Sequence, residues 1–486
     1  MNTAVRVQAL ESAFSALPKQ TAFCYVSARH AHTKVSHRRG IHSSPHNDQS
    51  AAYPNFNSPS ANAAAANGPS KAEVSALGFL PLTQILRSYM ITAVSSSPRL
   101  LDASSAILRR MLESKNFLFS LEKNPLARAL LYQTFYKQFC AGSTPAQVSA
   151  TSKQLREQGY GGVILEYALE VLKDAEGDEL KDVETWQKGM LASVSIAEAG
   201  DFIGLKWSGM GPAALRLCAA QKDPSEAMDK AMKHVCKAAA EKGVCLLPSA
   251  EENWNLPGYH AWTLNLQRIF NRDGQTVLYN TYQCYLKSAP ATLSRHLDIA
   301  RAEGFTLGAK LVRGAYLFSE ERSLIHDTIE DTHACYDGMM SALIHRDYNS
   351  VVPPTSSSAA ASAPWPASRV VIASHNANTV GLAQRLRQEQ LDRGEPLTPL
   401  VYAQLQGMAD EVSCSLLAAT RLSGGDESKF KEQVVKCIAW GSMTECLNYL
   451  LRRAAENKDA ASRTSDTRKA MGAEIWRRTK ASVGLA

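Results

Sequence analysis

Two adjacent arginines near the end of the chain are the clearest candidates for binding an anion. Tyr449, Arg452, Arg453 and Glu456 stand at positions i, i+3, i+4 and i+7, which form one face of a helix. A guanidinium group offers a planar fork of donors that matches a carboxylate, and Glu456 can balance charge or bond a cofactor hydroxyl. The spacing predicts a carboxylate site, with an exposed ion pair between Arg452 and Glu456 as the alternative.

Short apolar runs, each followed by a stretch with helical spacing, must position these residues. Strands that alternate with helices are typical of βαβ units and a parallel sheet. The runs span residues 162–165, 202–205, 244–247, 276–279, 307–312, 370–373, 400–403 and 434–439. Eight such units over about 290 residues predict an α/β fold of the (β/α)8 TIM-barrel type, in preference to an open doubly wound sheet.

Polar and cationic residues follow the ends of these runs. They are Lys206, Ser249–Glu252, Asn280–Gln283, Arg313–Tyr316, Ser374–Asn376, Gln404–Met408 and Trp440–Ser442. A barrel enzyme places its chemistry where the strands end, and a packed core has no use for such side chains there. The pattern therefore predicts an active site at this end of the barrel.

Several of these stretches also resemble the motifs of one enzyme family. Residues 310–317 read KLVRGAYL, which is similar to the signature of the proline dehydrogenase family. Residues 373–376, 404–408 and 449–457 resemble further motifs of that family in the same order, and residues 280–287 resemble its monofunctional eukaryotic members. The resemblance covers about residues 200–457.

The resemblance implies a distorted barrel that holds FAD non-covalently, oxidises L-proline to 1-pyrroline-5-carboxylate and passes electrons to membrane quinone. It implies that the proline carboxylate binds to Arg452, Arg453 and Lys206. It implies that the proline ring contacts Tyr449, Tyr316, Ala315 and Leu405. It implies that FAD contacts Lys310, Val312, Asn280, Ser374, His375 and Glu456.

Two positions depart from the family pattern. The family usually has aspartate where this chain has Ser249, and tyrosine where it has Cys437. Two alternatives to proline oxidation therefore stay open: the same chemistry on hydroxyproline or a related amino acid, and a non-catalytic regulatory relative. The intact arginine pair, Lys310 and His375 favour an enzyme.

The net charge of +7 is concentrated at the start of the chain. Residues 1–47 hold six lysines or arginines and one acid, which predicts a mitochondrial transit peptide and a protein on the matrix side of the inner membrane. The remainder is only mildly basic, so a nucleic-acid partner is not expected. The ten cysteines form no C-x-x-C pair, and the histidines show no ligand spacing, so no metal site is expected.

The rest of the chain divides by composition. We expect a disordered linker at 48–75, a helical N-terminal region at 76–155, and the barrel at 156–460 with a low-complexity insertion at 349–368. Residues 461–486 form a basic tail that also contains Met471, Ile475 and Trp476. That mixture fits a helix lying on the inner membrane, and equally a helix packed on the barrel. No run of 18 apolar residues exists, so any membrane contact is expected to be peripheral.

Overall fold

The computed structural model describes residues 75–114, 116, 121, 123–167, 177–355, 364–422, 432–456 and 461–484. The expected transit peptide at 1–47 lies outside these residues, as does the linker except for Ser75. The side chains of residues 452–456 and 461–463 are also outside the description.

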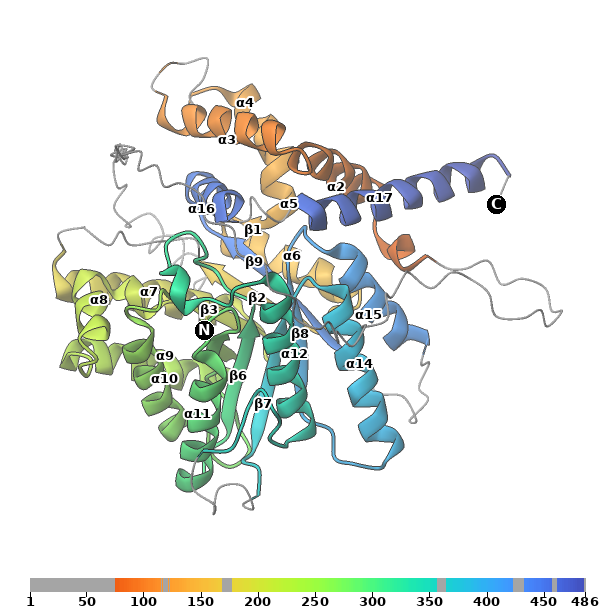
Figure 1. Ribbon diagram of the computed structural model, residues 1–486. Helices are drawn as coiled ribbons and strands as arrows, with labels where there is room; N and C mark the ends of the chain where they lie inside the picture. Colours follow the sequence, from red (N-terminus) through yellow and green to blue (C-terminus); the bar gives the residue numbers. More distant parts are fainter. Residues whose placement is uncertain are drawn as a thin grey trace, which may run out of the picture. The chain divides into compact units, whose positions relative to one another are not determined.

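Eight parallel strands form the barrel expected from the sequence (Figure 1). The barrel strands are β2 Gly162–Tyr167, β3 Phe202–Leu205, β4 Cys245–Pro248, β5 Asn280–Gln283, β6 Leu307–Val312, β7 Ser368–Ala373, β8 Leu400–Leu405 and β9 Gln433–Trp440, and a ninth, short strand is β1 Cys140–Gly142. The hydrogen-bonded order of the barrel strands is β4-β3-β2-β9-β8-β7-β6-β5. The short β1 pairs with β9 and is not part of this order. A parallel bridge between Leu246 and Leu278 joins the two ends of this order.

Helices connect the barrel strands, and further helices precede and follow the barrel in the chain. They are η1 Ala76–Phe79, α2 Leu82–Ser95, α3 Pro98–Glu113, α4 Pro125–Leu131, η2 Tyr132–Tyr136, α5 Lys137–Phe139, α6 Pro145–Glu157, α7 Glu179–Ile196, η3 Trp207–Met210, α8 Pro212–Ala219, α9 Glu226–Lys242, α10 Leu256–Phe270, α11 Ala289–Glu303, η4 Arg322–Leu324, α12 Ile329–His345, α14 Ala377–Asp392, α15 Asp410–Leu422, α16 Met443–Glu456 and α17 Ala461–Ser482. Side chains of Asp178, Ser225 and Thr328 cap the starts of α7, α9 and α12 by accepting backbone N–H bonds. Gly304 ends α11 at φ 68°, a left-handed conformation that glycine adopts without strain.

Strand β5, which corresponds to the fourth predicted apolar run, begins later than the sequence predicts. Its expected span was 276–279, but β5 is formed by 280–283. The side-chain oxygen of Asn271 accepts the backbone N–H groups of Val277 and Leu278, at 2.8 and 3.0 Å. A buried asparagine therefore takes the hydrogen bonds that a strand neighbour would otherwise make, and Asn280 lies within the strand.

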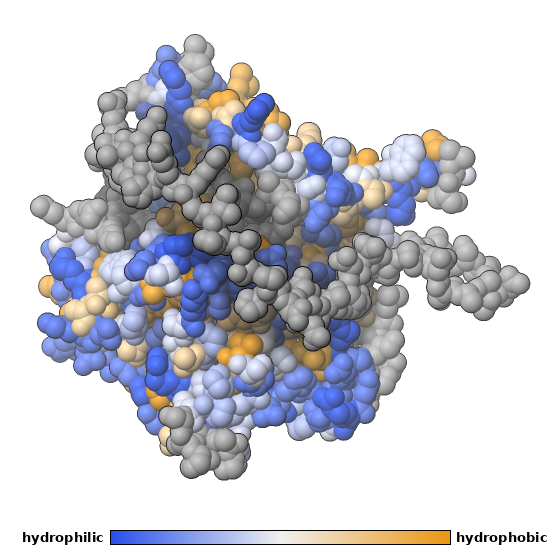
Figure 2. All heavy atoms as spheres, in the orientation of Figure 1, coloured by the Kyte–Doolittle hydropathy of each residue, from blue (hydrophilic) through white to orange (hydrophobic). Residues whose placement is uncertain are grey.

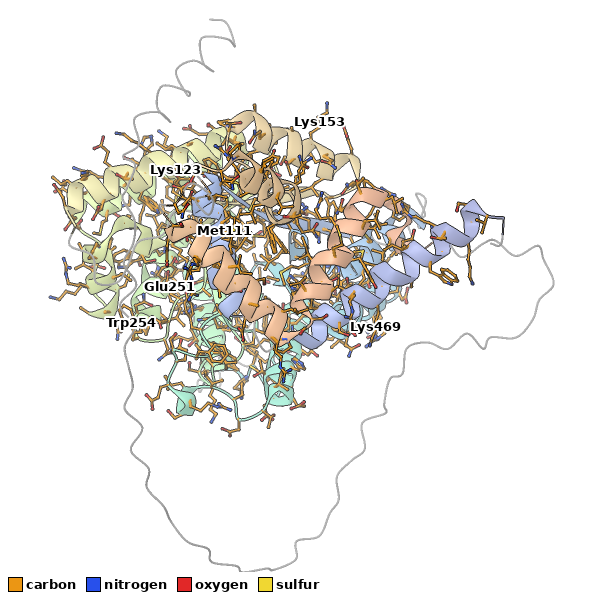
Figure 3. The ribbon with its side chains drawn as sticks, turned by 90° about the horizontal axis from the view of Figure 1, so that it is seen from above. Met111, Lys123, Lys153, Glu251, Trp254 and Lys469 are labelled. Atoms are coloured by element: carbon orange, nitrogen blue, oxygen red, sulfur yellow. The ribbon has the colours of Figure 1, made fainter. Side chains whose placement is uncertain are left out.

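The C-terminal helix packs against the N-terminal region. Met471 of α17 is fully buried in a cluster with Leu77, Leu80 and Ile85, and Ile475 packs against the same cluster. Viewed from above, α2 and α17 lie side by side (Figure 3). Two of the three apolar residues noted in the basic tail are therefore used for packing, while Trp476 is exposed.

The low-complexity insertion follows α12. Asn349 anchors its start, because its side-chain oxygen accepts the backbone N–H groups of Val351 and Val352. Val352 is buried, and residues 356–363 lie outside the described part of the chain. Among the described residues, no helix is long and apolar enough to span a membrane.

Candidate active site

Alternation along the strands decides which side chains face the interior of the barrel. Ile164 of β2, Val371 of β7 and Val435 of β9 belong to the interior core cluster. Residues two apart on a strand share a face, so Glu166 and Cys437 also face inward, nearer the carboxyl ends of β2 and β9. These ends are where a barrel enzyme carries its site.

Three of the predicted residues reach the interior by the same rule. Lys310 of β6 is in register with Val371, and Leu405 of β8 is in register with Cys437. Neighbouring residues in register point to the same side of a sheet, so both face inward, and Val312 follows Lys310 on that face. The interior near the strand ends thus combines a lysine with apolar walls.

Lys206 and Tyr316 are joined at the mouth of the barrel. Lys206 follows β3 in an extended conformation, and its Nζ donates to the Tyr316 hydroxyl at 3.2 Å. The Tyr316 hydroxyl in turn donates to the carbonyl of Ala250 at 3.0 Å. The expected carboxylate ligand and the expected ring contact are therefore direct neighbours.

Glu166 is a candidate site residue that the sequence patterns did not indicate. Its Oε2 accepts from the Tyr449 hydroxyl at 3.1 Å and from the Cys437 thiol at 3.5 Å. Cys437, one of the two departures from the family pattern, therefore contacts a strand β2 carboxylate. The first predicted run ended at Leu165, and extending the alternation by one residue would have placed Glu166 in the interior.

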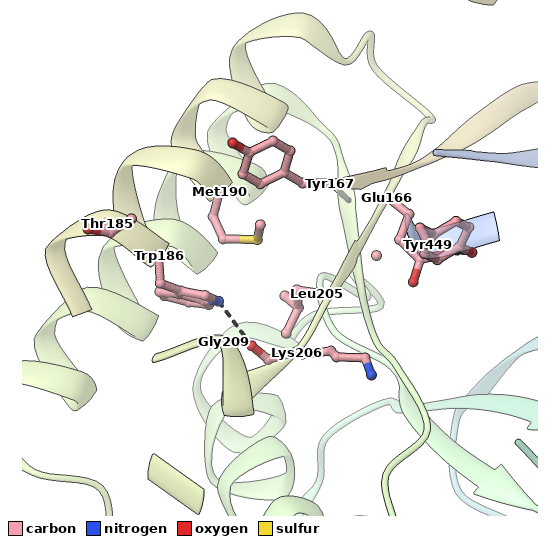
Figure 4. A pocket seen from close by; sticks show the side chains of 10 residues that line it. Glu166, Tyr167, Thr185, Trp186, Met190, Leu205, Lys206, Gly209 and Tyr449 are labelled. Atoms are coloured by element: carbon pink, nitrogen blue, oxygen red, sulfur yellow. Dashed lines mark hydrogen bonds between the residues drawn. The ribbon is translucent and has the colours of Figure 1, made fainter. Parts of the chain in front are cut away.

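A pocket at the outer edge of this region connects Glu166, Lys206 and Tyr449 (Figure 4). Helix α7 supplies its opposite wall through Trp186 and Met190. The Trp186 indole N–H donates to the carbonyl of Lys206 at 3.0 Å, drawn as a dashed line in Figure 4. Aromatic and aliphatic side chains thus enclose a pair of opposite charges.

Tyr167 also lines the pocket and remains a neutral phenol at physiological pH. Burial, with a smaller contribution from Glu445, raises the pKa of Tyr167 to about 12. The pocket therefore takes its charges from Glu166 and Lys206 among the side chains that line it in the described part of the chain.

Helix α16 carries Tyr449 and the arginine pair. Tyr449 is buried against Tyr136 and Cys140. The helix continues to Glu456, so Arg452, Arg453 and Glu456 stand on its next turns. Their side chains lie outside the described residues, and their contacts stay predictions.

The loop after β6 is held by two contacts. Gly314 lies flat against Tyr285, because a Cβ on Gly314 would meet the ring of Tyr285 at 2.4 Å. The backbone N–H of Ala315 donates to the Gln283 side chain at 3.1 Å. Together these contacts fix the segment that carries Ala315 and Tyr316.

Arg313, in the same motif, points away from the interior. Its guanidinium donates to His333, to the Ser374 hydroxyl at 2.8 Å and to the Thr379 hydroxyl at 2.8 Å, and it stacks on Tyr336. Ser374 is therefore tied to the end of β6. This arginine connects β6 to α12 and α14, which is a structural role.

His375 and Asn280 occupy different environments. The Nε2 atom of His375 accepts the backbone N–H of Leu405 at 3.1 Å, which places this histidine beside the interior end of β8. The Asn280 side chain is buried and bonds His260 of α10 at 2.6 Å. The structure therefore does not bring the Asn280 side chain to the barrel mouth, because as a strand residue it points toward the covering helices.

The sequence of this chain is similar to those of known proteins of one family. A sequence model described as proline dehydrogenase matches residues 148–466, about two thirds of the chain. The probable mitochondrial proline dehydrogenase of Schizosaccharomyces pombe is 29% identical over 448 residues, which cover 80% of this chain and 86% of that protein. Mitochondrial proline dehydrogenase 1 of Homo sapiens is 34% identical over 250 residues, which cover 51% of this chain and 38% of that protein.

A solved structure has the same fold. Proline utilization A from Bdellovibrio bacteriovorus superposes with a TM-score of 0.55 at 16% identity, covering 80% of this chain and 40% of that one. The barrel, its inward-facing residues and the family match are thus mutually consistent. The chain belongs to the proline dehydrogenase family.

Proposed function

We propose that this protein is an FAD-dependent proline dehydrogenase that oxidises L-proline to 1-pyrroline-5-carboxylate. The observation that carries the proposal is that Lys206, Glu166 and Tyr449 line one pocket at the carboxyl ends of the barrel strands, with Tyr316 bonded to Lys206 and Tyr449 bonded to Glu166. In a chain of this family, these side chains offer a cation for a carboxylate and aromatic walls for a small ring.

The proline carboxylate binds to Lys206 and the arginine pair in this proposal. Tyr449 lines the pocket, and Arg452 and Arg453 follow it on α16 by three and four residues, which is the same helix face. Two guanidinium groups can bind both carboxylate oxygens. Arg453 then fixes the direction in which the substrate enters the barrel.

Tyr316, Tyr449, Ala315 and Leu405 form the wall around the proline ring. Glu166 keeps the Tyr449 hydroxyl in place, and Lys206 does the same for Tyr316. A small substrate depends on such a rigid wall, because it has few atoms through which it can be oriented. Glu166 is therefore a positioning residue for Tyr449.

The residues near the interior fit a flavin. The side-chain oxygen of Gln406, just after β8, is buried and has no hydrogen-bond partner among the described residues. An unpaired buried amide oxygen costs free energy that an N–H donor of a ligand would recover. We propose that FAD is held by Lys310, Val312, Ser374, His375 and Glu456, while Asn280 supports β5 from behind.

FAD supplies the acceptor for the hydride that leaves the carbon next to the proline nitrogen. The chain contributes orientation and charge. Lys310 places a cation on the interior face, where it would stabilise negative charge on a bound flavin.

Hydroxyproline is the second candidate substrate. Cys437, smaller than the family's tyrosine, stands beside the Glu166 carboxylate. A smaller side chain next to a hydrogen-bond acceptor is suited to a substrate with an additional hydroxyl group. A comparison of oxidation rates with proline and hydroxyproline distinguishes the two substrates.

We further propose that electrons pass to quinone in the inner mitochondrial membrane, with the protein on the matrix side. Helices α3 and α4 expose several large apolar residues, seen as orange spheres near the top of Figure 2. Leu126 and Ile107 are 82% and 62% exposed. Exposed apolar clusters of this kind support contact with a membrane surface.

The experiment compares substrates directly. Purified protein is incubated with a soluble dye as electron acceptor and with either L-proline or trans-4-hydroxy-L-proline. The product of L-proline is expected to be lighter by two hydrogen atoms, as measured by mass spectrometry, and proline is expected to react faster. Oxidation of neither substrate by FAD-loaded protein would instead favour a non-catalytic relative.

A further inference from the structure

A second cavity lies outside the barrel interior, between α10 and α11. Its volume is about 380 Å³, within the range of about 300–1,000 Å³ that small-molecule sites occupy. Helix α10 contributes His260 and Ala261, and α11 contributes Thr292, Arg295 and His296. None of these side chains takes part in the proposed proline site.

Two buried histidines are fixed at this cavity by strand β5. The Nδ1 atom of His260 bonds the Asn280 side-chain oxygen at 2.6 Å, and the Nδ1 atom of His296 bonds the Tyr282 hydroxyl at 2.9 Å. The His260 and His296 rings meet edge to face, with centroids 5.3 Å apart. The outward side chains of β5 thus hold both rings in one orientation, with their remaining edges available to a ligand.

The two rings are uncharged at neutral pH. Burial lowers the pKa of His260 to about 4 and that of His296 well below its usual value. Each neutral ring offers one donor and one acceptor nitrogen, so it recognises polar groups without adding charge. The charge of the cavity must come from elsewhere.

Arg295 supplies that charge. Among the residues that line the cavity, all within the described part of the chain, Arg295 is the only one with a charged side chain, and it is exposed. The first residues of two helices, Leu256 of α10 and Ala289 of α11, also line the cavity. Helix N-termini carry partial positive charge, so all three contributions have the same sign.

The residue before α10 has a buried side chain without hydrogen bonds to the described residues. Asn255, directly before the helix, is 1% exposed, and neither polar atom of its side chain has a hydrogen-bond partner among the described residues. Leu256, the next residue, and Asn253, two residues earlier, line the cavity, whereas Asn255 itself does not. Buried polar groups are normally paired, which makes Asn255 an exception in the segment that leads into the cavity-lining start of α10.

Apolar side chains complete the lining. Leu256, Leu264, Leu286 and Ile299 surround the polar groups. A ligand that satisfies the whole cavity therefore carries one negative group and an apolar or aromatic body. We propose that this cavity binds a small organic monoanion, a carboxylate on an apolar or aromatic body, with Arg295 as its charge partner.

The test uses a pair of probes that differ in charge and not in shape. 1-Naphthoate and its neutral amide, 1-naphthamide, are titrated into the purified full-length protein by isothermal calorimetry. We expect naphthoate to bind at least about tenfold more tightly than naphthamide, because a charge-assisted bond to Arg295 contributes to one probe only. Equal affinity of the two probes, or no binding of naphthoate, would overturn the proposal.

Two variants locate the binding. Arg295→Gln is expected to weaken naphthoate binding about tenfold and leave naphthamide unchanged, while Ala261→Phe fills the cavity from its exposed side and weakens both. Lys237→Gln removes a charge from an exposed position on α9 and serves as the matched control with no effect. Naphthoate binding that survives both Arg295→Gln and Ala261→Phe would place the probe elsewhere, for example in the barrel, and contradict the proposal.

Discussion

At the residue scale, two charged side chains hold two aromatic rings at the barrel mouth. Lys206 bonds the hydroxyl of Tyr316, and Glu166 bonds the hydroxyl of Tyr449. Each bond removes rotational freedom from a ring that would contact a small substrate, before the substrate arrives. The two charged side chains therefore fix the positions of the rings and also set the electrostatic potential of the site.

Glu166 offers a direct test of this positioning role. Glu166→Ala leaves the Tyr449 hydroxyl without its acceptor, and we expect kcat/KM for proline to fall about tenfold, the effect of one hydrogen bond to a charged group. Glu166→Gln keeps an acceptor oxygen and should recover most of that loss. Glu241→Ala, at an exposed position of α9, is the control. Equal losses in the Ala and Gln variants would argue against positioning by this bond.

The arginine pair can be tested by charge and by geometry. Arg453→Met is expected to lower kcat/KM for proline at least about tenfold, since a charge-assisted bond to a carboxylate is worth about 1.5–3 kcal/mol, while FAD stays bound. Arg453→Lys should recover only part of the loss, because lysine lacks the planar fork. Unchanged kinetics, with only a small drop in melting temperature, would indicate an exposed ion pair instead.

The structure brings some of the predicted site residues close together and places others apart. Lys206 and Tyr316 follow strands and Tyr449 lies on α16, and the structure bonds Lys206 to Tyr316 and Tyr449 to Glu166. Asn280 was predicted to follow the end of a strand, but it is the first residue of β5 and its side chain bonds His260 of α10. A shift of one residue in the start of a strand moves each side chain to the opposite face of the sheet. Apolar runs in the sequence do not define strand starts to that accuracy.

At the element scale, the repeated strand–helix pattern was sufficient to predict the barrel. Seven of the eight predicted runs overlap observed strands, since β-branched runs followed by amphipathic helices have few other solutions. The displaced fourth strand depends on a side chain, Asn271, that bonds the backbone six and seven residues later. The short β1, next to β9, was not predicted, because three residues are too few to show the alternation that indicates a strand.

The loop after β6 depends on the absence of one side chain. In Gly314→Ala, the new Cβ would meet the ring of Tyr285 at 2.4 Å, so the segment carrying Tyr316 must shift. A displacement of about 1 Å at a reacting site costs up to about a hundredfold in rate. We expect kcat/KM for proline to fall at least about tenfold without unfolding, as measured by steady-state kinetics and circular dichroism.

Gly381→Ala is the matched control for this substitution. The nearest atom to its new Cβ is in Arg385 at 3.8 Å, and alanine is favoured in a helix such as α14. It should leave both kinetics and melting temperature equal to or better than those of the unaltered protein. Full activity of Gly314→Ala would mean that the loop tolerates the displacement of Tyr285.

At the scale of the whole molecule, the last helix closes the fold onto its beginning. Met471 of α17 is buried against Leu77 and Ile85, and Arg478 donates to the carbonyls of Leu77 and Leu80. The basic composition of the tail did not reveal this packing, because the partner residues lie about 390 positions earlier in the sequence. Contacts of this kind stabilise the N-terminal helices and the barrel together.

Met471→Ala measures that contribution. Truncating a fully buried methionine is expected to lower the free energy of unfolding by about 2–5 kcal/mol, as measured by urea denaturation. Lys469→Ala, whose side chain is 74% exposed on the same helix, should change it by less than about 0.5 kcal/mol. Similar small effects for both variants would mean that α17 detaches from the fold in solution.

The central claim is that the barrel uses FAD to oxidise proline, and an anaerobic spectrum tests it most directly. Purified protein should be yellow and contain about one FAD per chain, released by denaturation because the cofactor is not covalently attached. Stepwise addition of L-proline without any other electron acceptor should bleach the flavin absorption, with 1-pyrroline-5-carboxylate formed in equal amount to the flavin reduced. A folded protein that binds FAD but whose flavin spectrum is unchanged by excess L-proline would contradict the account.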